Sequence, residues 1–417
     1  GSGGAATPTG LSRELSGNID TTGPESAMLL ERRFVLKPGE TRTLRFLYGY
    51  LPHGAELTEL VNKYRHADKA LEQSSALWKK KGMRFSTASE PWVERELTWN
   101  HYYLRSSMTY DSFFQQHILS QGSVYQYVMG FQGAARDPLQ HALPFVFSDP
   151  EIVKDVLRYT LKEVRQDGSI PYGIVGQGMP MPTASDNSSD MPLWLLWAVS
   201  EYVLATRDSA FLDEKVTTFP VYGPDAGKES VRNLLARCYQ HLIRDVRTGE
   251  HGLMRMLHDD WNDALVAEWV PQKNLAECLE QGESVVNSAM APYVFDLYAR
   301  LLTYAGHDSN LVKDIRGKAE GHRKAVRQQW TGKWFRRAWL GPALGWLGEK
   351  GEWLEPQPWA IIGGTATAEQ TKQLVQAIDE LLRQPSPIGA IQLNKSPDMA
   401  QHAFSQPGTA VNGGVWP

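Results

Sequence analysis

The 417-residue sequence contains only two cysteines, Cys238 and Cys278, and no apolar run long enough to cross a membrane. Two cysteines without a metal-type spacing imply neither a disulfide framework nor a zinc site. A transmembrane helix needs about 20 predominantly apolar residues, so we expect no membrane partner. No signal peptide is visible, and we therefore expect a cytoplasmic protein.

The sequence also lacks an excess of charge of one sign and the common cofactor motifs. Its formal net charge is −4, which excludes the strongly basic surface typical of nucleic-acid-binding proteins. No Gly-rich nucleotide motif follows a strand, and no P-loop, HExxH or GxSxG is present. The eleven histidines are scattered without a ligand spacing. We therefore expect no nucleic-acid partner, no metal ion and no nucleotide cofactor.

Tryptophan, by contrast, is abundant, with 14 residues in a chain that is 42% hydrophobic. One interpretation is a large core; the other is a set of platforms on which the apolar faces of sugar rings stack. The length exceeds that of a typical single domain and predicts two or three domains or one large repetitive one.

The N-terminal part of the chain consists of three segments that differ in composition and in hydrophobic pattern. Residues 1–26 are rich in Gly, Ser, Thr and Pro, a composition typical of a flexible segment. Residues 27–54 contain two alternating runs around a Pro-Gly turn and predict two strands. Because two strands alone are marginally stable, we expect them to be the remnant of a larger β-domain. Residues 55–88 have helical spacing and predict a helical linker.

From residue 89 to 417, helical patterns follow one another and strand signals are almost absent. Polar and Gly-rich loops separate them, as in an α/α toroid, where the loops of one end form a pocket. The final stretch, AVNGGVWP, predicts a toroid that is incomplete at its C-terminus or is completed by another chain. The predicted helices cover residues 92–120, 150–165, 190–206, 228–245, 284–305, 310–330 and 366–383.

The segment HDDWNDAL, residues 258–265, places Asp259, Asp260 and Asp263 beside Trp261. A polar turn with a helix cap is one interpretation. Alternatively, desolvation beside the tryptophan and repulsion between like charges raise the pKa of one carboxyl group. A carboxylic acid with a raised pKa is the group that protonates a leaving glycosidic oxygen.

Other acidic and basic residues have both a structural and a functional interpretation. Glu283 opens a predicted helix, where the helix dipole favours it, or it faces the pocket of the toroid. Arg136 and Asp137 follow a Gly-rich aromatic loop. They are either a charged pair at the protein surface or residues that bind sugar hydroxyls. Asp190 with Pro192 fits a helix start. Further candidates are Asp186 in SDNSSD, and Glu355, Gln357 and Trp359 in WLEPQPW.

These segments, in this order, resemble glycoside hydrolase family 94, which comprises cellobiose and chitobiose phosphorylases and the related part of cyclic β-1,2-glucan synthases. The resemblance covers roughly residues 30–417 and implies a mostly α fold, with a β-sandwich, a helical linker and an (α/α)6 barrel. It is carried by ERRFVLKPGETRTLRFLYGY, YQYVMGFQGAARDPLQHALPFVFSDPE, SDNSSDMPLWLLWAVSEYVLATRD, DDWNDAL, GESV and LEPQPWAIIGG.

The resemblance implies a role for several residues. Asp263, the last residue of the Trp-Asn-Asp motif, corresponds to the general acid, and Trp261 to a wall of the −1 sugar subsite. Arg136 and Asp137 correspond to the family's −1 sugar site, and Gln357 to a loop near its active site. Together with the candidates from the sequence pattern, the residues expected to bind substrate are Arg136, Asp137, Asp186, Asp190, Asn262, Glu355, Gln357, Trp359 and Asn412.

The sequence departs from the family pattern in two places. The family has Phe before its Arg-Asp pair, whereas Ala135 stands here. Its phosphorylases have a phosphate-contacting histidine after a Gly-Gly turn, where this chain has Val415, Trp416 and Pro417.

Three functions remain open at this point. The first is an inverting phosphorylase of a β-linked gluco-oligosaccharide or glucoside, with inorganic phosphate as co-substrate and no other cofactor. The second is an inverting hydrolase, in which a base about 6.5–9.5 Å from the acid activates water. The third is a non-catalytic carbohydrate-binding or assembly subunit. Candidate bases are Glu283, Asp186, Asp190 and Glu355, and the resemblance adds a possible homodimer.

Overall fold

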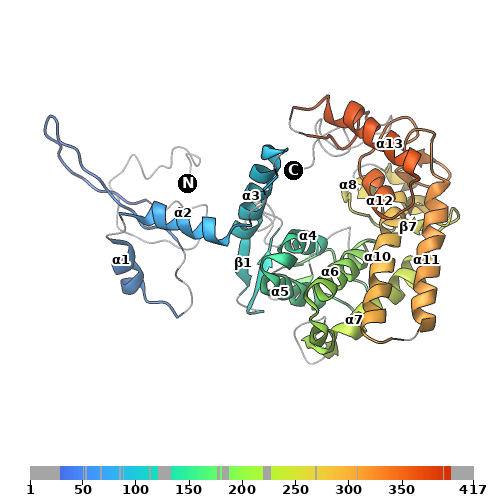
Figure 1. Ribbon diagram of the computed structural model, residues 1–417, viewed down its shortest axis with the longest axis horizontal. Coiled ribbons are helices and arrows are strands. Elements are labelled where there is room, and N and C mark those ends of the chain that lie inside the picture. The colour runs from blue at the N-terminus through green and yellow to red at the C-terminus, as the bar shows by residue number, and fades with distance from the viewer. Residues whose placement is uncertain are drawn as a thin grey trace. The chain divides into compact units, whose positions relative to one another are not determined.

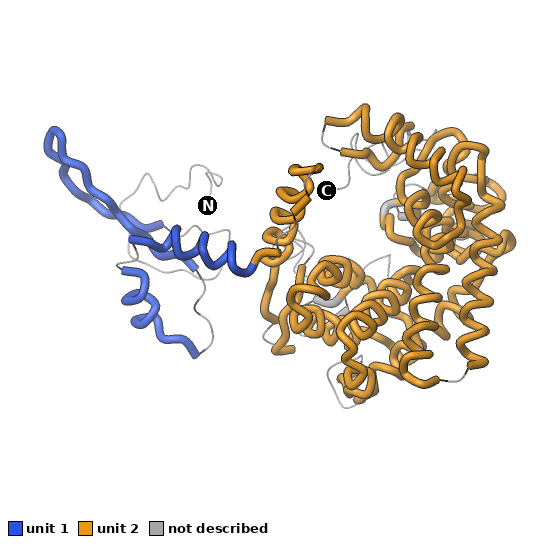
Figure 2. The backbone as a smooth tube through the Cα atoms, viewed as in Figure 1, with its two compact units in different colours: residues 1–81 blue, residues 82–417 orange. Residues whose placement is uncertain are grey.

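The structure is a computed structural model, and it separates the chain into two compact units, residues 1–81 and 82–417 (Figure 2). Each unit is described by itself. The residues that the structure describes are 29–49, 51, 54–65, 68–83, 86–87, 89–111, 114–120, 133–175, 179–180, 187–218, 227–267, 270–307, 309–387 and 389–395.

The first unit contains the two helices α1 (Leu57–Arg65) and α2 (Ala70–Lys81), in the region with helical spacing. Residues 29–49 form no strand, so the two predicted strands are absent there. The predicted turn is present, with the Glu40 amide donating to the Lys37 carbonyl at 2.9 Å.

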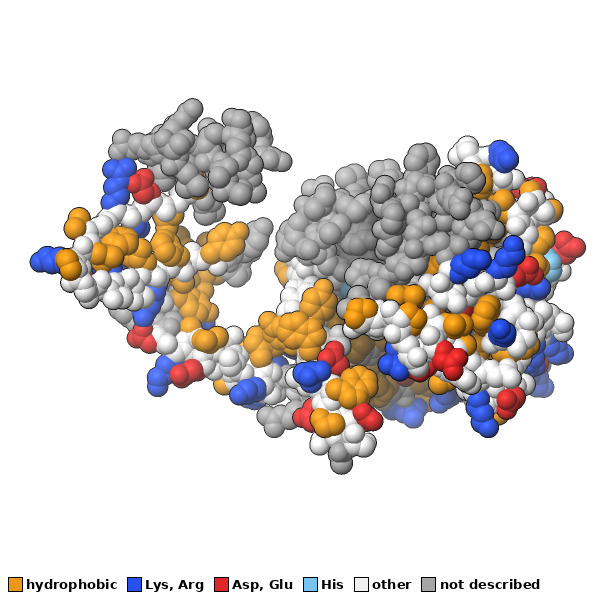
Figure 3. Space-filling model, turned by 90° about the horizontal axis from the view of Figure 1, so that it is seen from above, with side chains coloured by type: hydrophobic (Ala, Val, Ile, Leu, Met, Phe, Trp, Pro, Cys, Tyr) orange, Lys and Arg blue, Asp and Glu red, His pale blue; other side chains and the backbone are white. Residues whose placement is uncertain are grey.

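The missing strand pairing has a physical reason. Apolar side chains lie at the surface of the first unit (Figure 3). Among residues 29–49 the most exposed include Val35, at 85%, and Tyr48, at 92%. Within the described residues of this unit they have no sheet to bury them, and an isolated strand pair gains too little from burial to be stable.

The second unit is an α/α arrangement of an inner and an outer layer of helices (Figure 1). Each inner helix contacts the next inner one, and α5, α7 and α11 pack against the inner helix that precedes them. The mostly α fold and the (α/α)6 barrel class predicted from the sequence are confirmed. The inner helices are α4 (Arg136–Ala142), α6 (Met191–Thr206), α10 (Val285–Tyr304) and α12 (Pro356–Ile362); the others are α5 (Pro150–Leu161), α7 (Val231–His241), α11 (Ser309–Arg327) and α13 (Ala368–Ala377).

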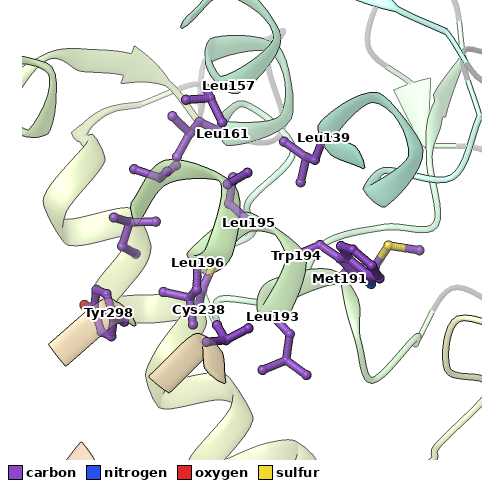
Figure 4. Close-up of a cluster of buried hydrophobic side chains, with 14 of the residues drawn as sticks. Leu139, Leu157, Leu161, Met191, Leu193, Trp194, Leu195, Leu196, Cys238 and Tyr298 are labelled. Carbon is purple, nitrogen blue, oxygen red and sulfur yellow. The ribbon is translucent and has the colours of Figure 1, made fainter. Parts of the chain in front are cut away.

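The hydrophobic pattern explains the two layers. Helices α6 and α10 are apolar on nearly all sides and almost wholly buried, as expected of helices inside a protein. Helices α5 and α11 are amphipathic and bury one face each. Side chains from α4, α5, α6, α7 and α10 meet in a continuous apolar core (Figure 4).

Short strands between the helices were not predicted. Helix α3 (Pro91–Ser106) ends well before residue 120, and the hairpin β1 (Met108–Asp111) and β2 (Gln116–Leu119) follows it. Most other strands have only two or three residues, too few for a visible alternation. They are β3 (Ile174–Val175) with β4 (Met179–Pro180), β5 (Lys215–Thr217) with β6 (Lys228–Ser230), and an antiparallel sheet in the order β10 (Trp346–Leu347), β9 (Ala338–Trp339), β8 (Glu283–Ser284), β7 (Met254–Arg255).

Three further features of the fold remain. The short helices α8 (Ala264–Ala267) and α9 (Gln272–Gln281) lie between β7 and β8. Cys238 and Cys278 are both buried and free. Among the helices that the structure describes, none is both long and apolar enough to cross a membrane.

Candidate active site

Arg136, the first residue of α4, joins three segments that are far apart in the sequence. The start of α4 is fixed by the Ala135 amide, which donates to the Tyr172 carbonyl at 2.7 Å. The Arg136 side chain is only 3% exposed. Its guanidinium donates to Asp190 Oδ1 at 3.3 Å, to the Trp261 carbonyl at 3.1 Å and to the Asp263 carboxylate.

Asp263 is held from two sides and remains partly open to solvent. Arg136 binds one of its oxygens, and the Tyr172 hydroxyl donates to the other at 2.6 Å. The Asp263 side chain is 22% exposed. The sequence pattern suggested a carboxyl group desolvated by Trp261; its direct partners are instead a guanidinium and a phenol.

Three more carboxyl groups surround the Arg136 guanidinium. Burial raises the pKa of Asp190 to about 6, against the opposing effect of Arg136. Burial likewise raises the pKa of Asp137 to about 7. Burial, and then repulsion from Asp263, raises the pKa of Asp259 well above its ordinary value. One guanidinium thus faces four carboxyl groups, and part of this group is protonated near neutral pH.

The neighbouring Asp260 has a different environment. Arg337 donates to both of its oxygens at 2.7 Å, and the Ser284 hydroxyl donates to Oδ2 at 2.6 Å. These contacts hold the pKa of Asp260 below its ordinary value despite complete burial. Arg337 also donates from Nε to Glu355 Oε2 at 2.8 Å. This network, Asp260–Arg337–Glu355, fixes the segment that carries Asp263.

A cavity of about 390 Å³ lies beside these carboxyl groups and is walled by tryptophans. Trp194 lines it and donates from Nε1 to Asp190 Oδ2 at 2.9 Å. Trp261 lines it as well, and its carbonyl accepts from Arg136. The cavity and the Arg136 group therefore share walls. The lining residues are Gln140, Trp194, Trp261, Val286, Leu354, Glu355, Pro358, Trp359, Ala390 and Gln392.

The structure brings most of the predicted site residues together. Asp263, Arg136, Asp137 and Asp190 lie in one group, and Trp261, Glu355 and Trp359 line the cavity. Asn262, 1% exposed, lies behind the cavity and donates from Nδ2 to Glu355 Oε1 at 3.2 Å.

Gln357 does not face the cavity. It is fully buried in the first turn of α12, where Oε1 accepts from the Phe335 amide and Nε2 donates to the Phe335 carbonyl, both at 2.9 Å. A third bond joins Nε2 to the Trp353 carbonyl at 2.9 Å. Because the backbone uses its whole amide, Gln357 is a structural residue, contrary to the predicted substrate contact.

Glu283 is also turned away from the site. Its carboxylate accepts from the amide and Nδ1 of His251, at 3.0 and 2.9 Å, and lies so close to Gly249 that a Cβ there would overlap it. The residue belongs to β8, and α10 starts only at Val285, with Ser284 as its cap. These contacts contradict the predicted role of Glu283 as a catalytic carboxylate facing the pocket.

Two predicted substrate-binding residues, Asp186 and Asn412, lie outside the described residues, as do Val415, Trp416 and Pro417.

Four residues of the site were missed by sequence reasoning. Tyr172 is in a long polar loop, and nothing in its neighbours indicates that its hydroxyl reaches residue 263. Arg337, in WFRRAWL, is a cation between aromatics, and a buried cation was a usable signal for a buried acid. Gln140 follows Arg136 by one helical turn, and Gln392 comes from the far end of the chain.

Comparison with known proteins places these residues in context. Residues 98–406 match the family described as "Glycosyl hydrolase 94 superfamily, catalytic domain". The chain is 28% identical over 378 residues to a solabiose phosphorylase from Paenibacillus borealis, covering 88% of this chain and 44% of that protein. It is 23% identical to a cellobionic acid phosphorylase from Neurospora crassa, over 92% of this chain and 46% of that protein.

The chain thus spans about half the length of the curated relatives it matches. Among solved structures, an uncharacterized conserved protein from Thermus thermophilus superposes with a TM-score of 0.50 and 12% identity. That match covers 76% of this chain and 83% of the other. At this level of identity, the likeness concerns the fold alone.

Proposed function

The chain belongs to the glycosyl hydrolase 94 superfamily, and we propose that it cleaves a β-glycosidic bond with inversion, using inorganic phosphate. One observation carries this proposal. The partly exposed carboxyl group of Asp263 is held by Arg136 and Tyr172, two residues after Trp261, which lines a tryptophan-walled cavity of about 390 Å³.

In the proposed reaction, Asp263 gives its proton to the glycosidic oxygen while a phosphate oxygen attacks the anomeric carbon from the opposite face. The bond between that carbon and the glycosidic oxygen breaks, and a sugar 1-phosphate of inverted configuration forms. The proton transfer leaves a negative charge on Asp263. Arg136 and Tyr172 already point at this carboxyl group, so they stabilise the charge as it develops.

Phosphate is preferred over water as the nucleophile because water requires a second carboxylate as base. Three of the candidate bases are engaged elsewhere. Glu283 is bound by His251, Glu355 by Arg337, and Asp190 by Arg136 and Trp194. The fourth candidate, Asp186, lies outside the described residues. An inverting hydrolase is therefore the second candidate function.

For the substrate, we propose a β-linked gluco-oligosaccharide or glucoside. Two relatives, named for solabiose and for cellobionic acid, are phosphorylases, which supports phosphorolysis of a sugar. The tryptophans of the cavity support a sugar ring, because aromatic faces bind apolar ring faces. Inorganic phosphate is the only co-substrate in this proposal. A cytoplasmic location and a homodimer or complementing chain remain predictions.

The test is to incubate the protein with β-linked gluco-oligosaccharides, with and without inorganic phosphate. Phosphate-dependent formation of sugar 1-phosphate is expected. Free reducing sugar without phosphate would support the hydrolase instead. No turnover, together with sugar binding that Asp263→Asn leaves unchanged, would support a non-catalytic carbohydrate-binding subunit.

A further inference from the structure

We propose that the tryptophan-walled cavity selects a neutral sugar ring and rejects sugars that carry a carboxylate. This inference rests on the proposed function only in taking the ligand to be a sugar. It comes from the polar atoms and the charges that line the cavity.

Two amide groups in the cavity wall have an atom without a hydrogen-bond partner among the described residues. They are Nε2 of Gln140, a donor, and Oε1 of Gln392, an acceptor. Both atoms are enclosed rather than exposed to solvent. Because a buried polar atom without a partner costs about 1–3 kcal/mol, these two atoms favour a ligand that offers both an acceptor and a donor. A sugar hydroxyl offers both.

The two amides are held in place by the surrounding structure. Gln140 lies on α4 four residues after Arg136, so the two side chains share a helix face. Gln392 donates from Nε2 to Glu355 Oε1 at 2.7 Å, and its backbone carbonyl accepts from the Leu354 amide at 2.8 Å. The Gln392 side chain therefore leaves its own carbonyl oxygen, Oε1, as the group available to a ligand.

The charges of the residues that line the cavity disfavour the binding of an anionic ligand. Glu355 is the one charged residue among those that line the cavity in the described part of the chain. Its cationic partner, Arg337, is fully buried and already donates to both Glu355 and Asp260. A sugar carboxylate in the cavity would lose its hydration, find no lysine, arginine or histidine among these lining residues, and lie near a second carboxylate. Both effects oppose its binding.

The experiment compares the affinities of neutral and acidic sugars for the whole chain by isothermal titration at pH 7. The probes are D-glucose with D-glucuronate, and cellobiose with cellobionate. We expect each neutral sugar to bind at least about tenfold more tightly than its acid, since an unpaired desolvated charge costs more than one hydrogen bond. Equal or tighter binding of the acids, or no binding of either, would overturn the inference.

Variants locate the selection in this cavity. Gln392→Leu and Gln140→Leu should each weaken cellobiose binding about three- to tenfold, the loss of one hydrogen bond. Gln376→Leu, on the exposed face of α13, is the matched control and should leave it unchanged. Glu355→Gln should narrow the gap between cellobiose and cellobionate. If both cavity variants bound cellobiose as the control does, the sugar would lie elsewhere.

These outcomes are separable from those of the proposed function. Selective binding of neutral sugars without any phosphorolysis would support the selection of neutral sugars and contradict the proposed phosphorylase activity. Phosphorolysis of an acidic substrate at the rate of its neutral analogue would support the phosphorylase activity and contradict the selection of neutral sugars.

Discussion

Arg136 and Arg337 are both almost completely buried and bind the same short segment from two sides, yet their surroundings differ. Arg337 meets Asp260 and Glu355, and hydrogen bonds occupy every oxygen of Asp260. Arg136 is surrounded by four carboxyl groups, two of which, Asp137 and Asp190, have pKa values raised to about 7 and about 6.

The two environments indicate different roles, one structural and one chemical, for acids that are neighbours in the sequence. A buried acid whose pKa is lowered by a bidentate guanidinium is a fixed charge and contributes to positioning. A group of acids with raised pKa values exchanges protons near neutral pH, which is the property that acid catalysis uses. Asp260 belongs to the first kind and its neighbour Asp259 to the second.

The largest expected effect is on activity at the Arg136 group. Asp263→Asn should lower turnover of a natural β-glucoside by about 10²–10⁴-fold, the range of a general acid, while sugar binding persists. Steady-state kinetics with a natural substrate and with an activated aryl glycoside measures this. The aryl substrate needs little protonation, so its rate should fall much less. Near-normal turnover of the natural substrate would remove Asp263 from the acid role.

The next effect is on stability at the Arg337 network. Arg337→Met leaves Asp260 buried and unpaired, and should lower the free energy of unfolding by about 3–5 kcal/mol. The control is the adjacent Arg336→Met, whose side chain is 26% exposed and pairs with Glu349. It should cost only about 1 kcal/mol, because its partner Glu349 is 47% exposed and solvent screens the pair. Denaturant unfolding measures the free energy of unfolding of both variants. Similar losses would show that Arg337 stabilises the protein no more than Arg336 does.

A sharper comparison uses two adjacent residues with opposite expected signs. Asp260→Asn should destabilise the protein by about 1.5–3 kcal/mol at pH 7 by weakening a charge-assisted network. The folded-state pKa of Asp260 is lowered, so its contribution exists above the ordinary value of 3.8 and is lost in acid.

Asp259→Asn should instead leave stability unchanged or raise it at pH 7. The folded-state pKa of Asp259 is raised, so the wild-type protein loses stability as the pH rises above 3.8, and the variant removes that loss. Unfolding free energies between pH 4 and 8 test both substitutions. Destabilisation by both at pH 7 would end the distinction between the two regions.

The smallest effect is expected at a buried carboxyl group that has no guanidinium partner in the described part of the chain. Glu352 is fully buried, neither oxygen has a hydrogen-bond partner among the described residues, and burial raises its pKa to about 7. Its neutral form is favoured in the fold, so stability should fall as the pH rises from 4.5 through about 7. Glu352→Gln should flatten this part of the profile and add about 1 kcal/mol at pH 8. An unchanged profile would contradict this assignment.

Most long helices of the second unit could be predicted from the sequence because their hydrophobic patterns are long, whereas the shorter α4, α9 and α12 were missed. Helices α5, α6, α7, α10, α11 and α13 fall within predicted ranges or within a residue of them. The strands could not, because two-residue strands such as β9 exist only through pairing with segments far away in the sequence. The strands predicted within residues 27–54 are absent from the described residues 29–49, because their alternating apolar side chains have no sheet there to bury them.

The sequence predicted which types of residue form the site, but it did not predict which side chains they contact. The cluster at 258–265 identified the acids, and the resemblance selected Asp263 among them. No local pattern tells that Asp260 turns toward Arg337 while Asp263 turns toward Arg136, because both partners lie more than seventy residues away. Glu283 was predicted to open a helix, and nothing in that local pattern indicates His251, which lies 32 residues earlier and binds its carboxylate.

Trp194 both lines the cavity and binds Asp190, so its fluorescence can report on the site. Its ring forms part of the cavity wall, and its Nε1 hydrogen bond ends on the titrating group Asp190. Indole emission responds both to a ring stacked on the indole and to a nearby charge. The difference in fluorescence between the native protein and Trp194→Phe should therefore report sugar entry and the protonation of Asp190 without any added label.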